Sequence, residues 1–200
     1  MFGKNKMTYE LRHVVKDSEI QDIFNMRYEV FISGMGRPDP GGSALTDVFD
    51  PKAIHVLASV DATPAGSIRF LPDAPQLYTL AGKEMEAFFK KGARLLEINC
   101  FVVRQQFRKS KVGPMIIRHN YLYPFKTGYD HIIAAAPASH TRLLTYYKRL
   151  GWRPFGRGHF SYDFSEPCDW ILLQVPIRSP LVMLRFWLLL PLLFALKRGK

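Results

Sequence analysis

The sequence predicts an α/β fold in which a mixed sheet carries helices on both faces. Strand-like and helix-like segments alternate along the 200 residues in the order βα, ββ, α, βα, βα, ββ, which is typical of layered sheet-and-helix domains. A hydrophobic content of 48% with 14% aromatic residues is sufficient for a sizeable core and excludes a disordered chain. The sequence has no internal repeat or low-complexity tract, so we expect one domain over residues 1–178.

The elements are placed by hydrophobic period and by Gly, Pro and capping residues. Ser18 and Gln21 form a capping-box pattern that predicts the start of the first helix, and Gly151 predicts the end of the last one. Residues 34–46, rich in Gly, Pro and Asp, predict a loop long enough to cover a site. The expected strands are residues 8–15, 53–60 and 66–71 around a turn at 61–64, then 95–103, 130–136, 160–164 and 170–175; the expected helices are residues 18–33, 84–91, 112–125 and 138–150.

Residues 179–200 differ in composition from the rest of the chain. Residues 181–196 read LVMLRFWLLLPLLFAL and precede a basic end. The run is shorter than the roughly 20 apolar residues of a spanning helix, and it contains Arg185 and Pro191, so we do not expect it to cross a bilayer alone. Trp187 and the flanking cations favour a segment lying at the membrane interface. Packing on the domain or completing a dimer are the alternatives.

The charge balance points to polyanionic partners. Twenty-eight Lys and Arg against seventeen Asp and Glu give a formal net charge of +11, which suits nucleic acid, an anionic membrane or an acidic protein. The sequence carries no recognisable nucleic-acid-binding signature, so we do not expect nucleic acid as a partner. Cys100 and Cys168 lack the spacing of a disulfide framework or a zinc site, and we expect no metal. The first residues lack a secretory apolar block, which predicts a cytoplasmic location, peripheral at the inner face of the membrane.

The stretch FRKSKVGPM at residues 107–115 links a predicted strand to a predicted helix. Such a loop presents backbone N–H groups to a phosphate and usually contains several glycines. This loop has Gly113 alone, together with Arg108, Lys109 and Lys111. The cations suit a phosphate-containing ligand that is carried on an acidic protein. They suit less a free ligand whose negative charge is only its own pyrophosphate.

The second half of the chain resembles the acyl-donor half of the GNAT N-acyltransferase superfamily. The resemblance lies in EINCFVV, VGPMIIRHNYL, HIIAAA and TYYKRLGW. Arg108 and Gly113 match the superfamily's donor loop, whereas Lys111 stands at its first glycine, and Tyr147 matches the tyrosine of its Tyr-x-x-x-Gly-aromatic signature. The resemblance implies the GNAT fold, with a mostly antiparallel sheet, and a pantetheine thioester as acyl donor.

The first half resembles acyl-homoserine-lactone synthases and long-chain N-acyl amino acid synthases. The matching positions are Arg27 and Phe31 on one helix, Asp47 and Asp50 in TDVFD, Arg69 in GSIRFLPD, and Glu97 in EINC. Two positions depart from the lactone synthases. Cys100 stands where they carry a further arginine, and their tryptophan after the first helix is replaced near Arg37. These departures favour an N-acyl amino acid over a lactone as product.

Acyl transfer from a thioester to an amine needs a base, a polarised carbonyl and a leaving thiol. The resemblance makes Glu97 the general base, since burial in an apolar strand raises a carboxylate pKa; an ion-paired strand-end carboxylate is the alternative. Tyr147 would protonate the departing thiol, or else serve as a core aromatic. Backbone N–H groups near Val102, where two strands diverge, would polarise the carbonyl.

Two further residue sets are expected to bind the substrates. Arg27, Asp47, Asp50 and Arg69 would form a charge network over the acceptor pocket beside Phe31, with one arginine free to hold a carboxylate; surface ion pairs are the alternative. The carrier-bound donor would meet Arg104, Arg108, Lys109, Lys111, Val112 and Gly113, with Arg142, Lys148 and Arg149 as additions.

The sequence therefore predicts an N-acyltransferase that moves a long-chain fatty acyl group from acyl carrier protein to the amine of an amino acid. We expect no tightly bound cofactor, and acyl-CoA is the alternative donor. Three alternatives remain: a lactone synthase using S-adenosylmethionine, a coenzyme A-dependent acetyltransferase, and a non-enzymatic module that binds membranes or acidic proteins. The acceptor, the acyl chain length and the oligomeric state are not predicted.

Overall fold

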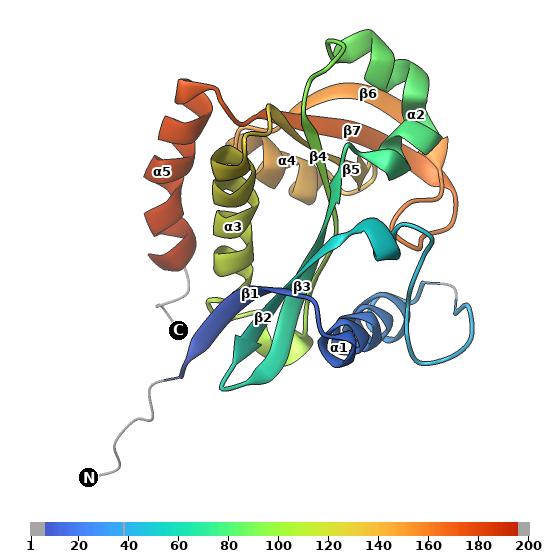
Figure 1. The fold of residues 1–200 in the computed structure, drawn as a ribbon, viewed down its shortest axis with the longest axis vertical. Helices are drawn as coiled ribbons and strands as arrows, with labels where there is room; N and C mark the ends of the chain where they lie inside the picture. Colours follow the sequence, from blue (N-terminus) through green and yellow to red (C-terminus); the bar gives the residue numbers. More distant parts are fainter. Residues whose placement is uncertain (1–6, 38, 196–200) are drawn as a thin grey trace.

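A computed structural model describes residues 7–37 and 39–195, and these form a single seven-stranded sheet flanked by helices (Figure 1). The strand order is β1-β2-β3-β4-β5-β7-β6, and within the described residues β4 and β5 are the one parallel pair of neighbours. The strands are β1 (Tyr9–Val14), β2 (Ile54–Val60), β3 (Thr63–Pro72), β4 (Leu95–Val103), β5 (His131–Pro137), β6 (Arg153–Phe160) and β7 (Cys168–Pro176). The predicted mixed, mostly antiparallel sheet is confirmed.

The helices lie on both faces of this sheet, as expected (Figure 1). Neighbouring residues of β2 show why: Leu57 packs with the apolar side chains of the first helix, whereas Val56 packs with those of the helix that follows β4. One face carries α1 (Asp17–Tyr28), which continues as a π-helical turn over Glu29–Ser33, and α2 (Pro75–Phe88); the other carries α3 (Val112–Thr127), α4 (Thr141–Arg149) and α5 (Pro180–Ala195).

Three local predictions are wrong. The strand expected at residues 160–164 lies earlier, at Arg153–Phe160, because an edge strand tolerates the Pro and Gly residues that lower strand propensity there. The first helix begins after Lys16 with no side-chain cap, so Ser18 lies inside the helix instead of capping it. The helix expected at 84–91 begins at Pro75, whose fixed φ suits a first helical turn.

The parallel pair β4–β5 separates partway along its length. Its register runs from Leu95↔His131 to Glu97↔Ile133, and the two strands part after Glu97. Cys100 then adopts a left-handed backbone conformation, with φ of 51°, next to a shift in the β3–β4 register. Such an irregularity bends a strand and leaves a gap in the sheet between neighbours. A cavity lined by residues of both strands opens at that gap.

Helix α5 packs beside α3 at one edge of the molecule (Figure 1). Its inner side chains Val182 and Phe186 belong to the main core, and Phe186 stacks on Tyr121 of α3 with ring centroids 4.3 Å apart. Its outer side chains Leu181, Leu184, Trp187 and Leu188 are exposed. Across the described residues, none of the helices has the length and apolar content to cross a membrane. The basic end at 197–200 lies outside the described residues.

Candidate active site

A cavity of about 280 Å³ fills the gap between β4 and β5. Its walls are mostly apolar, which suits a hydrocarbon chain, and a few polar side chains gather at one part of it. The strands contribute Ile98, Asn99, Phe101, Ala134, Ala135 and Pro137; the helices contribute Ile117, Asn120, Tyr121, Leu143, Tyr146 and Tyr147; the segments near α1 and after β6 contribute Phe31, Met35, Arg37, Tyr162 and Asp163.

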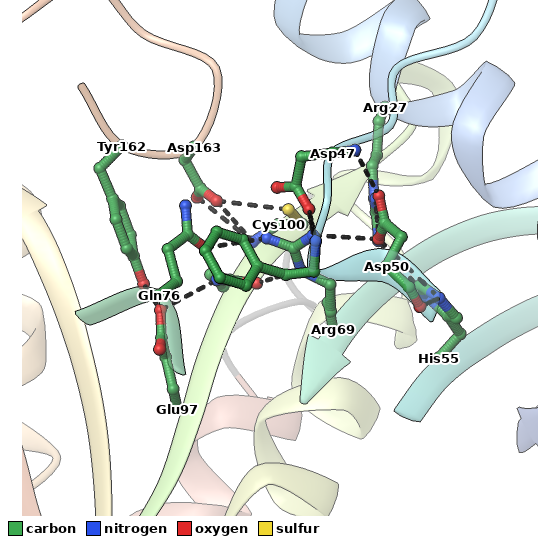
Figure 2. A network of polar contacts seen from close by, with 12 residues as sticks. Arg27, Asp47, Asp50, His55, Arg69, Gln76, Glu97, Cys100, Tyr162 and Asp163 are labelled. Atoms are coloured by element: carbon green, nitrogen blue, oxygen red, sulfur yellow. Dashed lines mark hydrogen bonds and ion pairs between the residues drawn. The ribbon is translucent and has the colours of Figure 1, made fainter. Parts of the chain in front are cut away.

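Beside this cavity lies a charge network that includes Arg27, Asp47, Asp50 and Arg69 (Figure 2). Asp50 accepts hydrogen bonds from Arg27 Nη1 at 2.8 Å and from Arg69 Nη1 at 3.0 Å. Asp47 accepts a second bond from Arg69 Nη1 at 2.6 Å. Burial alone would raise the pKa of Asp50, but the two guanidinium groups outweigh it and hold that pKa below its usual value. The two pairs with Asp50 are buried, whereas Asp47 is partly exposed, so the arginines do not form the surface ion pairs that were the alternative.

The network continues from Arg69 to Glu97 through two amide side chains. Arg69 Nε donates to Asn99 Oδ1 at 2.7 Å, and Arg69 Nη2 donates to Gln76 Oε1 at 3.0 Å. Asn99 Nδ2 in turn donates to Gln76 Oε1 at 2.7 Å and to Glu97 Oε1 at 3.2 Å. Each polar group therefore fixes its neighbour's orientation, and Glu97 is held by the same network that holds the arginines.

Glu97 has no exposed surface and does not line the cavity itself, but it bonds Tyr162 and Asn99, which do. Figure 2 shows Glu97 beside Tyr162. Leu77 N–H donates to its Oε2 at 3.1 Å, and the Tyr162 hydroxyl donates to its Oε1 at 2.9 Å. Burial raises the pKa of Glu97 to about 7 despite these hydrogen bonds. Tyr162 itself lines the cavity, so a proton can pass from the cavity to Glu97 through that hydroxyl.

Tyr147 and Val102 occupy different positions relative to the cavity. Tyr147 lines it, and burial, with Asp163 and Tyr146 nearby, raises the pKa of this phenol to about 12, so it carries its proton at neutral pH. Val102 is buried opposite Ser67 of β3 and packs with the side chains of α1. Phe101 and Asn99, which line the cavity, bring β4 backbone closer to it than Val102 does.

The predicted donor-binding residues form a loop and the first turn of α3. Arg108, Lys109 and Lys111 are exposed, whereas Arg104 pairs with Glu29 at 2.8 Å. Val112 is fully buried against Gly66, where an added Cβ would lie 2.8 Å from Val112 Cγ1, so Val112 serves to seat α3 on the sheet. Ser110 Oγ accepts the Val112 N–H at 3.2 Å, and so one amide of the helix start already has a partner.

Sequence reasoning missed five polar residues of the site: Arg37, Gln76, Asn99, Tyr162 and Asp163. The last two come from the loop between β6 and β7, which crosses to β4, and Asp163 accepts the Cys100 N–H at 3.0 Å (Figure 2). Burial raises the pKa of the Cys100 thiol, so this thiol stays neutral. The charge of the arginine at the matching position of lactone synthases is therefore missing here. The described residues contain no group of three or more His, Cys, Asp or Glu side chains placed to hold a metal ion.

Comparison with known proteins identifies a family. The sequence model of the N-acyl amino acid synthase FeeM family matches residues 22–174. In contrast, no curated protein sequence matches the chain.

Solved structures with the same fold fall into three groups. FeeM, an N-acyl amino acid synthase from uncultured soil microbes, shares 15% identity at a TM-score of 0.70, over 88% of this chain and 94% of its own. MesI, a CoA-dependent acyl-homoserine lactone synthase, shares 17% identity at a TM-score of 0.68, over 91% of this chain and 95% of its own. A putative acetyltransferase from Acinetobacter baylyi shares 10% identity at a TM-score of 0.60, over 88% of this chain and 97% of its own. These likenesses confirm the predicted GNAT fold.

Proposed function

The chain belongs to the N-acyl amino acid synthase FeeM family, and on that premise we propose that it transfers a long-chain fatty acyl group from acyl carrier protein to the amine of an amino acid. Membership makes the chain an acyltransferase, which sets aside the non-enzymatic binding module. The observation that carries the finer proposal is the apolar cavity in the β4–β5 gap, with the Glu97–Tyr162 pair at its polar part.

The first chemical step is attack of the acceptor amine on the thioester carbonyl carbon. The amine must lose a proton as the C–N bond forms. That proton passes to the Tyr162 oxygen while the Tyr162 proton passes to Glu97 Oε1, which lies 2.9 Å away. A carboxylate with a pKa of about 7 is matched to this task at neutral pH, because it is substantially ionised and still basic.

The second step is collapse of the tetrahedral intermediate, in which the C–S bond breaks and the thiolate leaves. Tyr147 donates its proton to that sulfur, yielding the free pantetheine thiol, and then regains a proton from water while Glu97 releases the amine proton to water. A thiol has a pKa of about 8.5, so the thiolate leaves readily and this help is smaller than that of the base. Backbone N–H groups of β4 beside the cavity polarise the carbonyl oxygen, and Val102 remains a candidate among them.

The donor is proposed to arrive on acyl carrier protein because of the donor loop, defined as residues 104–113. Its exposed Arg108, Lys109 and Lys111 suit an acidic protein surface, and the +11 net charge would steer that protein toward them. Acyl-CoA is the alternative donor, which the CoA-dependent MesI uses on the same fold. Residues Arg142, Lys148 and Arg149 of α4 are also exposed and are further candidates for this role.

Mass spectrometry of lipid extracts tests this function. Cells that express the chain should accumulate an N-acyl amino acid that is missing from cells expressing Glu97→Gln at equal protein level. A product that is a lactone and requires S-adenosylmethionine would replace our proposal with the lactone synthase. An acetylated product made from acetyl-CoA would replace it with an acetyltransferase.

We also propose that residues 179–200 hold the enzyme on an anionic membrane at its inner face. Leu181, Leu184 and Leu188 share one exposed face of α5, at helical spacing, and Arg185 lies on that face. Arg185 also lines a groove of about 500 Å³ together with other cations from α4 and β6. Those cations are Lys148, Arg153 and Arg157. Exposed leucines beside a cationic groove suit a surface of acyl chains under anionic headgroups.

Vesicle sedimentation tests the membrane proposal. The enzyme should sediment with vesicles of phosphatidylglycerol and phosphatidylcholine and remain in solution with phosphatidylcholine alone. The pair Leu184→Ser and Leu188→Ser should weaken binding without loss of acyl transfer in detergent, since both side chains are exposed. Failure of the unmodified enzyme to sediment with the anionic vesicles would contradict the proposal, whatever the catalytic outcome.

A further inference from the structure

The terminal nitrogens of the two arginines matched by family spacing already have partners, and among the described residues only Arg27 Nε lacks one. Arg27 and Arg69 have no exposed surface. Arg69 uses all three of its nitrogens on Asn99, Asp47, Asp50 and Gln76, and Arg27 uses both terminal nitrogens on Asp50 and His55. A substrate carboxylate could take two nitrogens of either guanidinium only by displacing buried partners, which would leave those partners' charges unpaired. Neither arginine lines the cavity.

Arg37 is in the opposite situation. It lines the cavity, and its Nη1 is buried with no hydrogen-bond partner among the described residues. Its guanidinium lies 4.1 Å over the ring of Phe31, and its backbone N–H donates to Phe31 O at 3.1 Å, so both ends of the residue are positioned. Burial lowers the pKa of Arg37, as expected for a cation that has lost water without gaining a full counter-charge. Such a group is stabilised by an anionic ligand.

Asp163 brings the opposite charge to the same cavity. Asp163 and Phe164 both have positive φ values, 53° and 61°, which is unfavourable for side chains of this kind and is a feature of functional sites. The centroid of the Phe164 ring lies 6.2 Å from that of the Phe31 ring, and the Arg37 guanidinium lies over the same Phe31 ring. In the described residues the Asp163 carboxylate accepts hydrogen bonds from Cys100 alone, through its N–H and its thiol, which leaves lone pairs for a further donor.

We infer that Arg37 and Asp163 together bind a free α-amino acid, with its carboxylate on the Arg37 guanidinium and its amino group on Asp163, where the ammonium form binds and loses one proton to water before the neutral amine attacks. This inference rests on the proposed function and specifies its acceptor. A bidentate arginine matches the planar carboxylate, and the aspartate neighbours Tyr162, which passes the amine proton to Glu97. The acceptor class is therefore a small molecule that carries both groups, in contrast to a polyamine, a simple amine or a protein lysine.

The test compares an amino acid that the enzyme acylates with its methyl ester and its decarboxylated amine. Arg37→Gln should raise the KM for the amino acid on the order of 10- to 100-fold, as expected for loss of a charged hydrogen-bonded pair. It should leave kcat/KM for the ester and the amine at the wild-type value, which is itself low for both. Arg37→Lys should recover part of the loss. Asp163→Asn should lower kcat/KM for all three acceptors, because each carries the amine.

Arg178→Gln is the matched control, since Arg178 is an exposed arginine that pairs with Asp130 outside the cavity. It should leave the KM and the kcat/KM for each of the three acceptors unchanged. If the wild-type enzyme acylates amino acids while Arg37→Gln keeps the wild-type KM, the inference fails and the proposed function stands. If the wild-type enzyme acylates the decarboxylated amine as well as the amino acid, the inference fails in the same way. If it acylates no amine, the proposed function itself fails.

Discussion

Two sets of arginines lie around the same cavity and differ in how completely they are paired. Arg27 and Arg69 are buried, each bonded to carboxylates or polar side chains on at least two of its nitrogens. The second set is Arg37, which lines the cavity and whose Nη1 has no hydrogen-bond partner among the described residues. The difference teaches that an arginine whose spacing resembles a family pattern can be part of the scaffold, whereas an arginine outside that pattern can be better placed to meet a ligand.

The buried set is also connected to the proposed base. The hydrogen-bonded chain that starts at Arg27 runs through Asp50, Arg69 and Asn99 to Glu97 (Figure 2). Because Glu97 is oriented by that chain, the network fixes the position of the proposed base without itself touching substrate. Substitutions in the two sets should therefore have separable effects on chemistry, stability and substrate affinity.

The largest expected effect follows from Glu97→Gln. Loss of the base should lower kcat about 10²- to 10⁴-fold, the range typical of a general base. Tyr162→Phe should lower kcat in the same direction because it interrupts the relay. Steady-state kinetics with a saturating acyl donor measure both. Retention of wild-type kcat in Glu97→Gln would show that the base lies elsewhere, with Asp163 the next residue to test.

Next in size is the effect of Arg69→Gln on folding. Removing this guanidinium leaves Asp47 and Asp50 without their shared partner, and breaking a buried pair in this way costs about 3–5 kcal/mol of unfolding free energy. Chemical denaturation measures it. Arg37→Gln is the contrast and should change the unfolding free energy by less than about 0.5 kcal/mol. Equal losses in the two variants would remove the distinction between the two sets.

The pH dependence of catalysis should follow the pKa of Glu97, about 7. Below that value kcat should fall about tenfold for each pH unit as the base becomes protonated. The effect on stability has the opposite sign: the folded pKa lies above the ordinary 4.5, so Glu97 lowers stability as the pH rises from 4.5 to about 7. Glu97→Gln should remove both dependences, which pH-resolved kinetics and denaturation would reveal.

Charge reversal in the donor loop should have the smallest effect on the enzyme itself. Replacing Arg108, Lys109 and Lys111 by Glu should raise the KM for acyl carrier protein about tenfold at low salt, and less at high salt, because exposed charges are screened. Acyl-pantetheine, which carries no protein, should react as with the wild-type enzyme. Indifference of the carrier-bound donor to these substitutions would favour acyl-CoA.

The sequence predicted the local features of the fold well. The residues of β4 form one apolar run that is bounded as predicted, and the turn at Asp61 and Ala62 connects β2 and β3 with two positive φ values. The strand β6 was misplaced because its Pro154, Gly156 and Gly158 contradict strand propensity, and only its pairing with β7 makes it a strand. Tertiary pairing of this kind leaves no local signal.

The site was predictable only where spacing is shared with relatives. Asp47, Asp50, Arg69 and Glu97 were found in that way, and the structure joins them in one network. Tyr162 and Asp163 could not be found, because their role depends on a loop that crosses to a strand more than sixty positions away in the chain. Arg37 differs again. The sequence showed only that the tryptophan of lactone synthases is replaced near this position, whereas the buried Nη1 without a partner is what suggests a ligand-binding role.

The face-to-face stack of Tyr121 and Phe186 has a consequence for redesign. Tyr121 is at once a wall of the hydrocarbon cavity and the surface on which the C-terminal helix rests. Trimming Tyr121 to admit a bulkier fatty tail would therefore also remove the support under Phe186 and loosen the hold of that helix. Substrate capacity and attachment of the last helix are coupled traits in this enzyme, and evolution or an engineer must change them together.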